Sequence, residues 1–350
     1  MNTRHGGTGP FDSQAGEVKI AVEAWDDELA KPTPVDDVTA GVRKARREIG
    51  PAVRHVVNLG IFALAVIGAF AGFGVAFMHV VNDPLADAAA YYEAASRLNA
   101  GQPLYPAGID PNSNHIYLYP PLFAVALRPL ALLPFEWFAL VWELIVVASF
   151  VALLRYLGVR KKSVWLAIGI LGVPVGWALT VAQAHVPFTY LLALGQPWSI
   201  ALAANLKLTP VLIALWWLGR RDFQSFVAFL VWMTVLALAQ VLLETRGSFA
   251  FFDNVGFEQI GQVRNISPYA QSEVLWIGLV LAGAVAVLAL SRTRWGWPAA
   301  VTLVTLSPPR LLVYMLMGLL AGLRHPKIAG EPEPEQELSD PATVYARSVR

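Results

Sequence analysis

Long apolar runs, separated by short polar or basic stretches, fill the chain between about residues 55 and 326. A helical membrane span needs about 20 apolar residues in a row, and the run at 56–80 has that length. The pattern therefore predicts an all-α, polytopic integral membrane protein with about eight to ten helical segments. The later apolar stretches cover 120–134, 135–155, 163–182, 186–218, 223–243, 274–290, 299–306 and 311–323.

Both ends of the chain are polar and punctuated by proline. Residues 1–54 and 327–350 have the low hydrophobicity that favours disorder. The basic stretch RKARR at 43–47 stands before the first span, and Lys and Arg next to spans prefer the cytoplasm. We therefore expect a disordered cytoplasmic arm, a membrane domain at 55–326 and a disordered cytoplasmic tail.

Four further basic stretches constrain the topology: RYLGVRKK, GRRD, SRTRWG and RHPK. All four become cytoplasmic if 120–155 makes one crossing with a short half-helix and 299–323 forms a hairpin. Strict alternation of spans would instead place RKK outside, and the parity stays open because 120–134 and 299–306 are shorter than a full span. We favour the first arrangement. The loops 82–119 and 244–273 and the SPPR tip at 307–310 then meet on the extracytoplasmic side.

Composition agrees with a membrane protein and excludes several functions. The chain is 56% hydrophobic and 15% charged, whereas soluble domains average about 25% charged residues. It contains no cysteine, which excludes disulfides, thiolate zinc sites and cysteine nucleophiles. The net charge of +1 says nothing about nucleic acid, but no basic patch interleaved with aromatics appears outside the membrane edges, so we expect no nucleic acid partner.

The first outer loop opens with NDPLADAAAYYEAASRLNAGQPLYP, residues 82–106, which predicts a surface helix over 83–100. Asp83 is expected to be the N-cap, Pro84 the first helical position and Gly101 the stop. An apolar stripe at positions 85, 88, 92 and 95 suits a helix lying on the membrane surface.

Asp87 falls one turn into this helix, on the same side as Tyr91. The positive end of the helix dipole should keep its carboxylate ionised, and an ionised carboxylate at the membrane surface is a usable general base. The alternative is a surface amphipathic helix whose acidic residues only solvate it.

The segment DAAAYYEAASRLNAGQPLY (87–105), followed by YLYPPLFAVALRPLALLP (117–134), resembles the opening of glycosyltransferase family 87. NLKLTPVLIALWWLGRRD (205–222), NIS (265–267) and SPPRLLVY (307–314) are similar to later motifs of that family. The positions that match are Asp87, Tyr91, Tyr92, Gly101, Tyr105, Tyr119, Pro120, Pro121, Pro134, Lys207 and Pro210.

This resemblance implies a GT-C-like fold with its site at the extracytoplasmic surface of the cell membrane. It implies transfer of a mannose-like hexose, with inversion, from a polyprenyl-phosphate donor to a lipid or glycan acceptor, with Asp87 as base. Among the cations Arg97, Arg128, Lys207, Arg264 and Arg310, we expect Lys207 and Arg310 to meet the donor phosphate. The full set expected to bind donor or acceptor is Tyr91, Tyr92, Tyr105, Tyr119, Gln183, Lys207, Arg264, Asn265 and Arg310.

Two departures from the family pattern stand out. Ala182-Gln183 replaces the usual Gly-Gln, and the segment after SPPR has Val313, Tyr314 and Met315 where many members carry His or Asp. A partner subunit derived from a transferase therefore remains an alternative, as does a transporter or lipid-binding protein without chemistry.

The sequence gives only weak evidence for a metal site or for histidine as a metal ligand. We expect no cofactor, although loop carboxylates leave a divalent ion open. His115 and His185 stand alone, which favours loop or interface roles over metal ligation.

Overall fold

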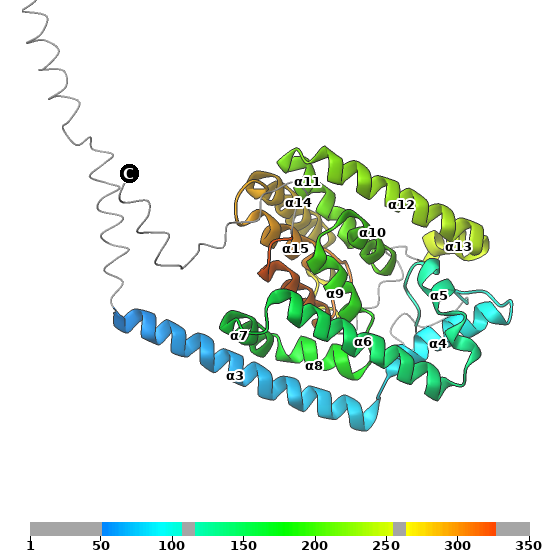
Figure 1. Cartoon of the computed structure of the whole chain (residues 1–350), viewed down its shortest axis with the longest axis horizontal. Coiled ribbons are helices and arrows are strands. Elements are labelled where there is room, and N and C mark those ends of the chain that lie inside the picture. Colours follow the sequence, from blue (N-terminus) through cyan, green and yellow to red (C-terminus); the bar gives the residue numbers. More distant parts are fainter. Residues whose placement is uncertain (1–50, 107–115, 255–263, 327–350) are drawn as a thin grey trace, which may run out of the picture. The chain divides into compact units, whose positions relative to one another are not determined.

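The computed structural model describes residues 51–106, 116–254 and 264–326. Within these ranges every regular element is an α-helix or a 3-10 helix, which confirms the all-α prediction. Contacts divide the chain into a unit that ends at Ile61 and a unit from Phe62 onward. The account below concerns the second unit (Figure 1). The predicted arm and tail lie almost wholly outside the described residues.

Four described helices are long and apolar enough to cross a membrane: α3 (Pro51–Asn82), α6 (Phe135–Leu157), α12 (Phe223–Leu243) and α14 (Glu273–Leu290). The pair α7 (Lys162–Ile170) and α8 (Gly172–Thr180) makes a fifth candidate if this pair, bent by 75°, is one span. Most side chains on the four long helices are exposed to the surroundings although they are apolar, as lipid-facing surfaces require. The polytopic membrane prediction is confirmed by these helices.

The apolar stretch 186–218 is a chain of short helices. It contains α9 (His185–Leu194), α10 (Pro197–Leu206), η2 (Thr209–Leu212) and α11 (Ile213–Arg220). Gly195 adopts φ +62° and Pro197 starts the next helix, so the chain turns between α9 and α10. Such breaks give the described residues more helices than the eight to ten predicted.

These short helices form the buried centre of the unit. Packing runs from α6 to α9, from α9 to α10 and from α10 to α12, so α9 and α10 lie between two of the long helices (Figure 1). The largest fully buried side chains include Trp216, Trp297 and Phe188.

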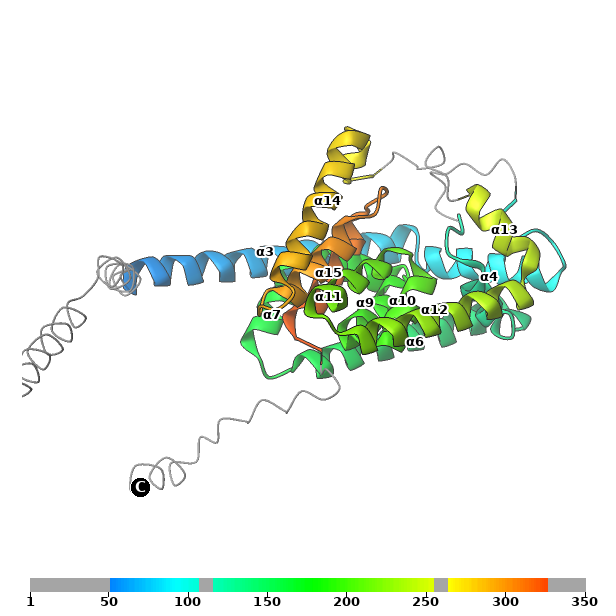
Figure 2. The same ribbon diagram turned by 90° about the horizontal axis from the view of Figure 1, so that it is seen from above.

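The apolar stretches 120–134 and 299–306 were predicted to be too short for a full crossing, and the helices that form in them are short. The first holds α5 (Pro121–Leu127) and η1 (Leu130–Leu132). The second is a hairpin of α15 (Gly296–Leu306) and η5 (Val313–Leu323), which pack side by side with the SPPR tip between them. In Figure 2 this hairpin lies next to α14, with which α15 is in contact.

The loop helix α4 runs from Ala86 to Asn99 and corrects two predictions. Asp83 is not its N-cap, because the helix starts later, after Leu85 in the left-handed conformation with φ +59°. The expected membrane-surface stripe is buried in protein, since α4 packs against α5, α6 and η1. Ala88 and Ala95 are completely buried.

Glycines bring α3 against α7 and α8. A β-carbon at Gly72 would lie 2.3 Å from the carbonyl oxygen of Gly172, and one at Gly68 would lie 2.3 Å from that of Gly169. Small residues four apart allow this close backbone approach between membrane helices. The first predicted span is thereby held against the segment that leads to Gln183.

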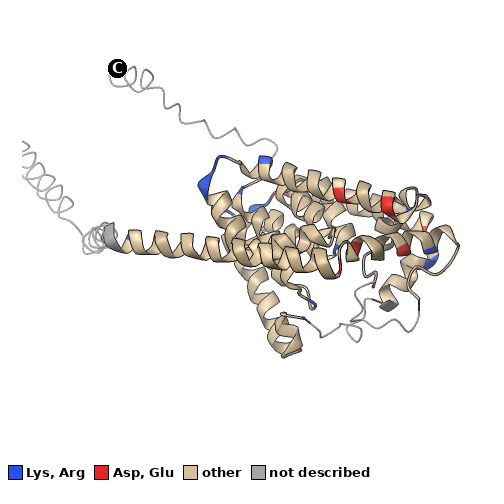
Figure 3. Ribbon diagram, turned by 90° about the horizontal axis from the view of Figure 1, so that it is seen from below, with Lys and Arg blue, Asp and Glu red and all other residues tan. Residues whose placement is uncertain are grey.

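Charge is divided between the two ends of this unit. In Figure 3 most Lys and Arg lie at the end where α6 runs into α7, and most Asp and Glu lie toward the opposite half. This separation is consistent with the favoured positive-inside topology. The second predicted outer loop, 244–273, contains α13 (Thr245–Asn254) and η4 (Pro268–Ala270).

Candidate active site

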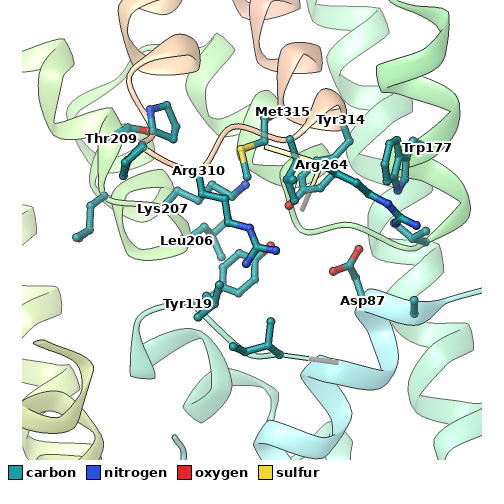
Figure 4. Close-up of a pocket in the computed structure, with 18 of the residues that line it drawn as sticks. Asp87, Tyr119, Trp177, Leu206, Lys207, Thr209, Arg264, Arg310, Tyr314 and Met315 are labelled. Atoms are coloured by element: carbon teal, nitrogen blue, oxygen red, sulfur yellow. The ribbon is translucent and has the colours of Figure 1, made fainter. Parts of the chain in front are cut away.

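A cavity of about 440 Å³ lies where the three predicted outer elements meet. Asp83 and Tyr119 reach it from the first loop, Phe251 and Arg264 from the second, and Arg310 from the SPPR tip. Figure 4 shows Asp87, Lys207, Arg264 and Arg310 around this cavity. The predicted convergence of three sequence-distant segments is therefore confirmed for their described residues.

Asp87 directs its carboxyl group into the cavity from the first turn of α4 (Figure 4). Burial raises the pKa of this group to about 7, against the lowering effect of nearby Lys207. The sequence predicted a fully ionised carboxylate. That prediction fails because the start of α4 faces protein: the N–H groups of Leu85 and Asp87 donate to the carbonyls of Thr180 and Val181.

Three of the five candidate cations line the cavity: Lys207, Arg264 and Arg310. The other two lie elsewhere. Arg97 forms a 3.9 Å ion pair with Glu93 on α4, and Arg128 donates from Nε to the Asn99 side chain at 3.0 Å. The candidates for binding an anion in this cavity are therefore Lys207, Arg264 and Arg310.

Lys207 ends α10 in an extended conformation just before Pro210. Its Nζ atom is buried, and no residue in the described part of the chain accepts a hydrogen bond from it. The ammonium lies 5.0 Å from the centre of the Tyr314 ring, within cation–π range. A buried ammonium without an acceptor is costly, so a bound anion would stabilise it.

Arg264 reaches the cavity from a strained backbone position, with φ +60°. Its guanidinium lies 5.9 Å from the Trp177 ring centre, on the side of the cavity near Asp87 (Figure 4). The ring of His79 packs on Trp177 with 4.9 Å between centroids. His79, Trp177 and Tyr314 line the cavity but were not predicted as site residues. Their sequence signal was weak: a polar or aromatic residue in or beside an apolar stretch.

Tyr119 lines the cavity, whereas Tyr91 and Gln183 are buried and do not line it. The Gln183 side-chain oxygen accepts hydrogen bonds from the hydroxyl groups of Tyr91, at 2.7 Å, and Tyr119, at 2.5 Å. The Ala184 N–H donates to the Tyr91 hydroxyl at 3.1 Å. Tyr91, predicted to share one side of α4 with Asp87, is thus joined to Gln183 and Tyr119 in a buried hydrogen-bonded cluster.

The remaining predicted site residues support the cavity without lining it. Tyr105 donates to the Tyr119 carbonyl at 2.6 Å, and Tyr92 packs edge-on against Phe135 and Phe138. Asn265 donates to the Pro309 carbonyl at 3.0 Å and thereby fixes the SPPR segment.

Of the two histidines discussed in the sequence, the structure describes His185. His185 is buried and its Nε2 lies 2.8 Å from the Met315 carbonyl oxygen, so it joins α9 to η5. His115 lies outside the described residues. Among the described residues no group of three His, Asp or Glu side chains has the arrangement of a metal site.

The family model of glycosyltransferase family 87 matches residues 117–323 of this chain. The protein belongs to glycosyltransferase family 87. The match includes Tyr119 and the three cavity cations, while Asp87 lies before it. No solved structure gives a significant match.

Two curated relatives carry the same name, "Polyprenol-phosphate-mannose-dependent alpha-(1-2)-phosphatidylinositol pentamannoside mannosyltransferase". The protein from Mycobacterium tuberculosis is 23% identical over 254 residues, which cover 65% of this chain and 58% of the relative. The protein from Mycolicibacterium smegmatis is 26% identical over 147 residues, 37% of this chain and 34% of the relative. The alignments thus cover little more than half of the first relative and a third of the second.

Proposed function

We propose that this family 87 protein is a membrane enzyme with a GT-C-like fold that transfers a mannose-like hexose. The donor is a polyprenyl-phosphate sugar and the acceptor is a hydroxyl group of a lipid or glycan at the extracytoplasmic face. The observation that carries the proposal is one cavity containing the Asp87 carboxyl group and three cations, Lys207, Arg264 and Arg310. The names of the two mycobacterial relatives support the donor class.

The cations suit the charge change of the reaction. A polyprenyl-phosphate sugar is a phosphodiester with one negative charge, and the departing polyprenyl phosphate is a monoester with nearly two. Positive groups that already face the phosphate stabilise the charge that develops as the sugar–oxygen bond breaks. Lys207, whose ammonium has no hydrogen-bond acceptor among the described residues, is the first candidate for this contact.

Asp87 suits the other half of the reaction, activation of the acceptor. Its carboxylate takes the proton of the acceptor hydroxyl as the oxygen attacks the anomeric carbon, and the bond from that carbon to the phosphate oxygen breaks. The phosphate leaves as a stable anion and needs no acid, so one carboxylate suffices where a glycosidase uses two. A single displacement of this kind inverts the anomeric configuration.

The cavity walls suit a lipid-linked donor. Its lining combines the polar groups above with the apolar side chains of Ile116, Leu118, Leu206, Leu208 and Leu312. A polyprenyl chain attached to the phosphate needs such a surface. The exposed apolar faces of the spans support a site that is supplied with donor from the surrounding lipid.

The experiment is sugar transfer by the purified protein, reconstituted in lipid vesicles with radiolabelled polyprenyl-phosphate mannose and an extract of acceptor lipids. Asp87→Asn keeps the size of the side chain but cannot accept the proton. We expect it to bind donor normally and to transfer sugar at least about a hundredfold more slowly. Glu93→Gln is the matched control, since Glu93 lies on the same helix, away from the cavity.

Near-normal transfer by Asp87→Asn would reject Asp87 as the base. A wild-type protein that forms no labelled product but moves donor across the membrane would support the transporter alternative. Loss of activity in Glu93→Gln as well would mean that α4, and not the carboxylate of Asp87, is the sensitive feature.

A further inference from the structure

We propose that α13 is an interfacial helix: it lies along the membrane surface, with the side chains of Phe249 and Phe252 in the lipid and Phe251 on the cavity side. The partner of this surface is the lipid bilayer itself. Contact between α13 and the bilayer is independent of the reaction proposed above, because it concerns the wall of the cavity and not the chemistry inside it.

α13 begins where the candidate span α12 ends. The two helices are separated only by Glu244, whose backbone lies outside the helical region with φ −149° and ψ 73°. The Glu244 side chain accepts a hydrogen bond from the Gly247 N–H at 2.9 Å, and its carbonyl accepts one from the Ser248 N–H at 3.0 Å. These are the bonds of a helix N-cap. α13 is therefore a new helix, and Figure 2 shows it turned away from the direction of α12.

The side chains of α13 divide into two faces. Phe249 is 67% exposed and Phe252 is 74% exposed, and their spacing of three residues puts them on one side of the helix. Arg246 is exposed at the edge of that side. Ser248 and Phe251 lie on the other side and are buried. The exposed face thus combines two aromatic rings with a cation.

The buried face of α13 packs on the first outer loop and on the cavity. α13 contacts α5, and the centre of the Phe251 ring lies 6.1 Å from that of Tyr105. A β-carbon at Gly247 would lie 3.4 Å from the Leu104 side chain, so the helix approaches the loop closely. Phe251 also lines the cavity. One helix therefore has its inner face on the cavity and its outer face toward the surroundings.

The exposed face of α13 continues the lipid-facing surface of α12. Leu242 and Leu243, the last two residues of α12, are both exposed, and Phe249 follows in the next helix. Contact with water would leave Phe249 and Phe252 unfavourably hydrated, whereas lipid removes that cost. Arg246 beside them can reach the phosphate groups at the membrane surface. Aromatic side chains with a neighbouring cation are typical of helices that lie in the interface.

A second copy of the chain fits this face less well than lipid does. Two phenylalanine side chains bury about 300–500 Å² together. A stable protein–protein interface buries at least about 1,200 Å². Burying Arg246 beside the two rings would also cost free energy, because its charge would lose water. Lipid covers an apolar surface of any size and leaves the cation at the headgroups.

The test measures the depth of α13 by electron paramagnetic resonance, which the cysteine-free chain allows. A nitroxide is attached to Phe249→Cys, Phe252→Cys or Ser248→Cys in protein reconstituted in vesicles of phosphatidylcholine and phosphatidylglycerol. Leu238→Cys, at an exposed position within α12, is the reference for lipid, and Gln102→Cys is the reference for water. Collisions of the label with dissolved oxygen report lipid, and collisions with a water-soluble nickel chelate report water.

We expect the labels at Phe249 and Phe252 to lie about 5–10 Å inside the headgroup boundary, less deep than the label at Leu238. Their ratio of oxygen to nickel collisions should exceed that of the label at Gln102 about tenfold. The label at Ser248 should be immobilised and reached by neither reagent, because that side of the helix is packed against protein.

Nickel collisions at Phe249 and Phe252 as frequent as at Gln102 would overturn the proposal, since this face would then lie in water. Labels shielded from both reagents would also overturn it and would indicate that protein, such as a second copy of the chain, covers the face. A depth equal to that of Leu238 would place α13 inside the membrane and not at its surface. The measurement needs no turnover, so the expected depths in a protein that transfers no sugar would retain the interfacial helix while rejecting the proposed function.

Discussion

The Lys207 ammonium lies 5.0 Å from the centre of the Tyr314 ring, and no described residue accepts a hydrogen bond from it. The ring contact offsets part of the cost of burying this charge but leaves its three N–H donors without acceptors. Asp87 lies near enough to act on Lys207 electrostatically, but within the described residues it does not accept a hydrogen bond from the ammonium. The arrangement is that of a site prepared for an anion.

Lys207→Met should therefore weaken donor binding about 10- to 100-fold, the loss expected for a hydrogen bond to a charged group. The same change should stabilise the ligand-free protein, because it removes a buried charge without an acceptor. Arg310→Met should weaken donor binding in the same direction. Titration of donor into detergent-solubilised protein, together with thermal unfolding, measures both effects. Lys162→Met is the control, because Lys162 is exposed at the start of α7. Unchanged donor affinity in both Lys207→Met and Arg310→Met would show that neither residue binds the donor.

The transfer rate should depend on pH through Asp87. Its pKa is raised to about 7, mainly by burial, and only the deprotonated form takes the acceptor proton. The profile of kcat/KM should therefore have an acid limb near neutrality, with about a tenfold loss per pH unit well below it. It should fall again at higher pH as Lys207, whose pKa burial lowers to about 7, loses the charge that binds the donor phosphate. Removing the Lys207 charge should move the limb upward, since Lys207 lowers the Asp87 pKa. A profile that is flat between pH 5 and 8 would contradict this role for Asp87.

Sequence reasoning predicted the parts of the site that depend on composition and order. Asp87 and Arg310 stand in polar segments between long apolar stretches, Lys207 is a single charge within such a stretch, and all three line one cavity. The break of 186–218 at Gly195 was also visible, because the sequence GQP sets a glycine, which favours a helix end, just before a proline, which favours a helix start.

What the sequence did not predict depends on contacts between distant residues. Gln183 forms a hydrogen bond with Tyr91, which is 92 positions away in the sequence, and no local sequence pattern predicts that contact. The ionisation of Asp87 was misjudged for the same reason: burial and the carbonyls of α8 replace the free helix terminus that the local sequence suggested. Tyr314, noted in the sequence only as a departure from the family pattern, turns out to carry the Lys207 contact.

The proposed topology predicts that Gln102 faces the extracytoplasmic side and Ser163 the cytoplasm. Both residues are exposed, and the chain has no cysteine of its own. In intact cells a membrane-impermeant maleimide should label Gln102→Cys at once and Ser163→Cys only after permeabilisation. The unsubstituted protein is the blank. The reverse labelling pattern would invert the topology and place the cavity on the cytoplasmic side.

The last prediction concerns Ala182, which holds the left-handed position at the end of α8 with φ +56°. A residue with a β-carbon is strained there by about 1–2 kcal/mol, whereas glycine is not. Glycine loses more backbone entropy on folding, so Ala182→Gly should raise the free energy of unfolding by about 1 kcal/mol or less. Because the turn and the hydrogen bond that Trp142 donates to the Ala182 carbonyl remain, Gln183 should keep its place and transfer should be unchanged.

An alanine-to-glycine substitution should lower the stability, instead of raising it, where the alanine has ordinary helical geometry. Ala300→Gly, in the middle of α15, should lower stability by about 1 kcal/mol, because it adds the helix penalty of glycine. Ala182→Val should also lower stability, and it should slow transfer because a β-branched side chain resists the left-handed conformation on which the direction of Gln183 depends. Apparent midpoints of thermal unfolding in one detergent, with transfer rates beside them, measure all three variants. A lower midpoint for Ala182→Gly than for wild type would show that the turn at Ala182 is relaxed and that its geometry does not depend on strain.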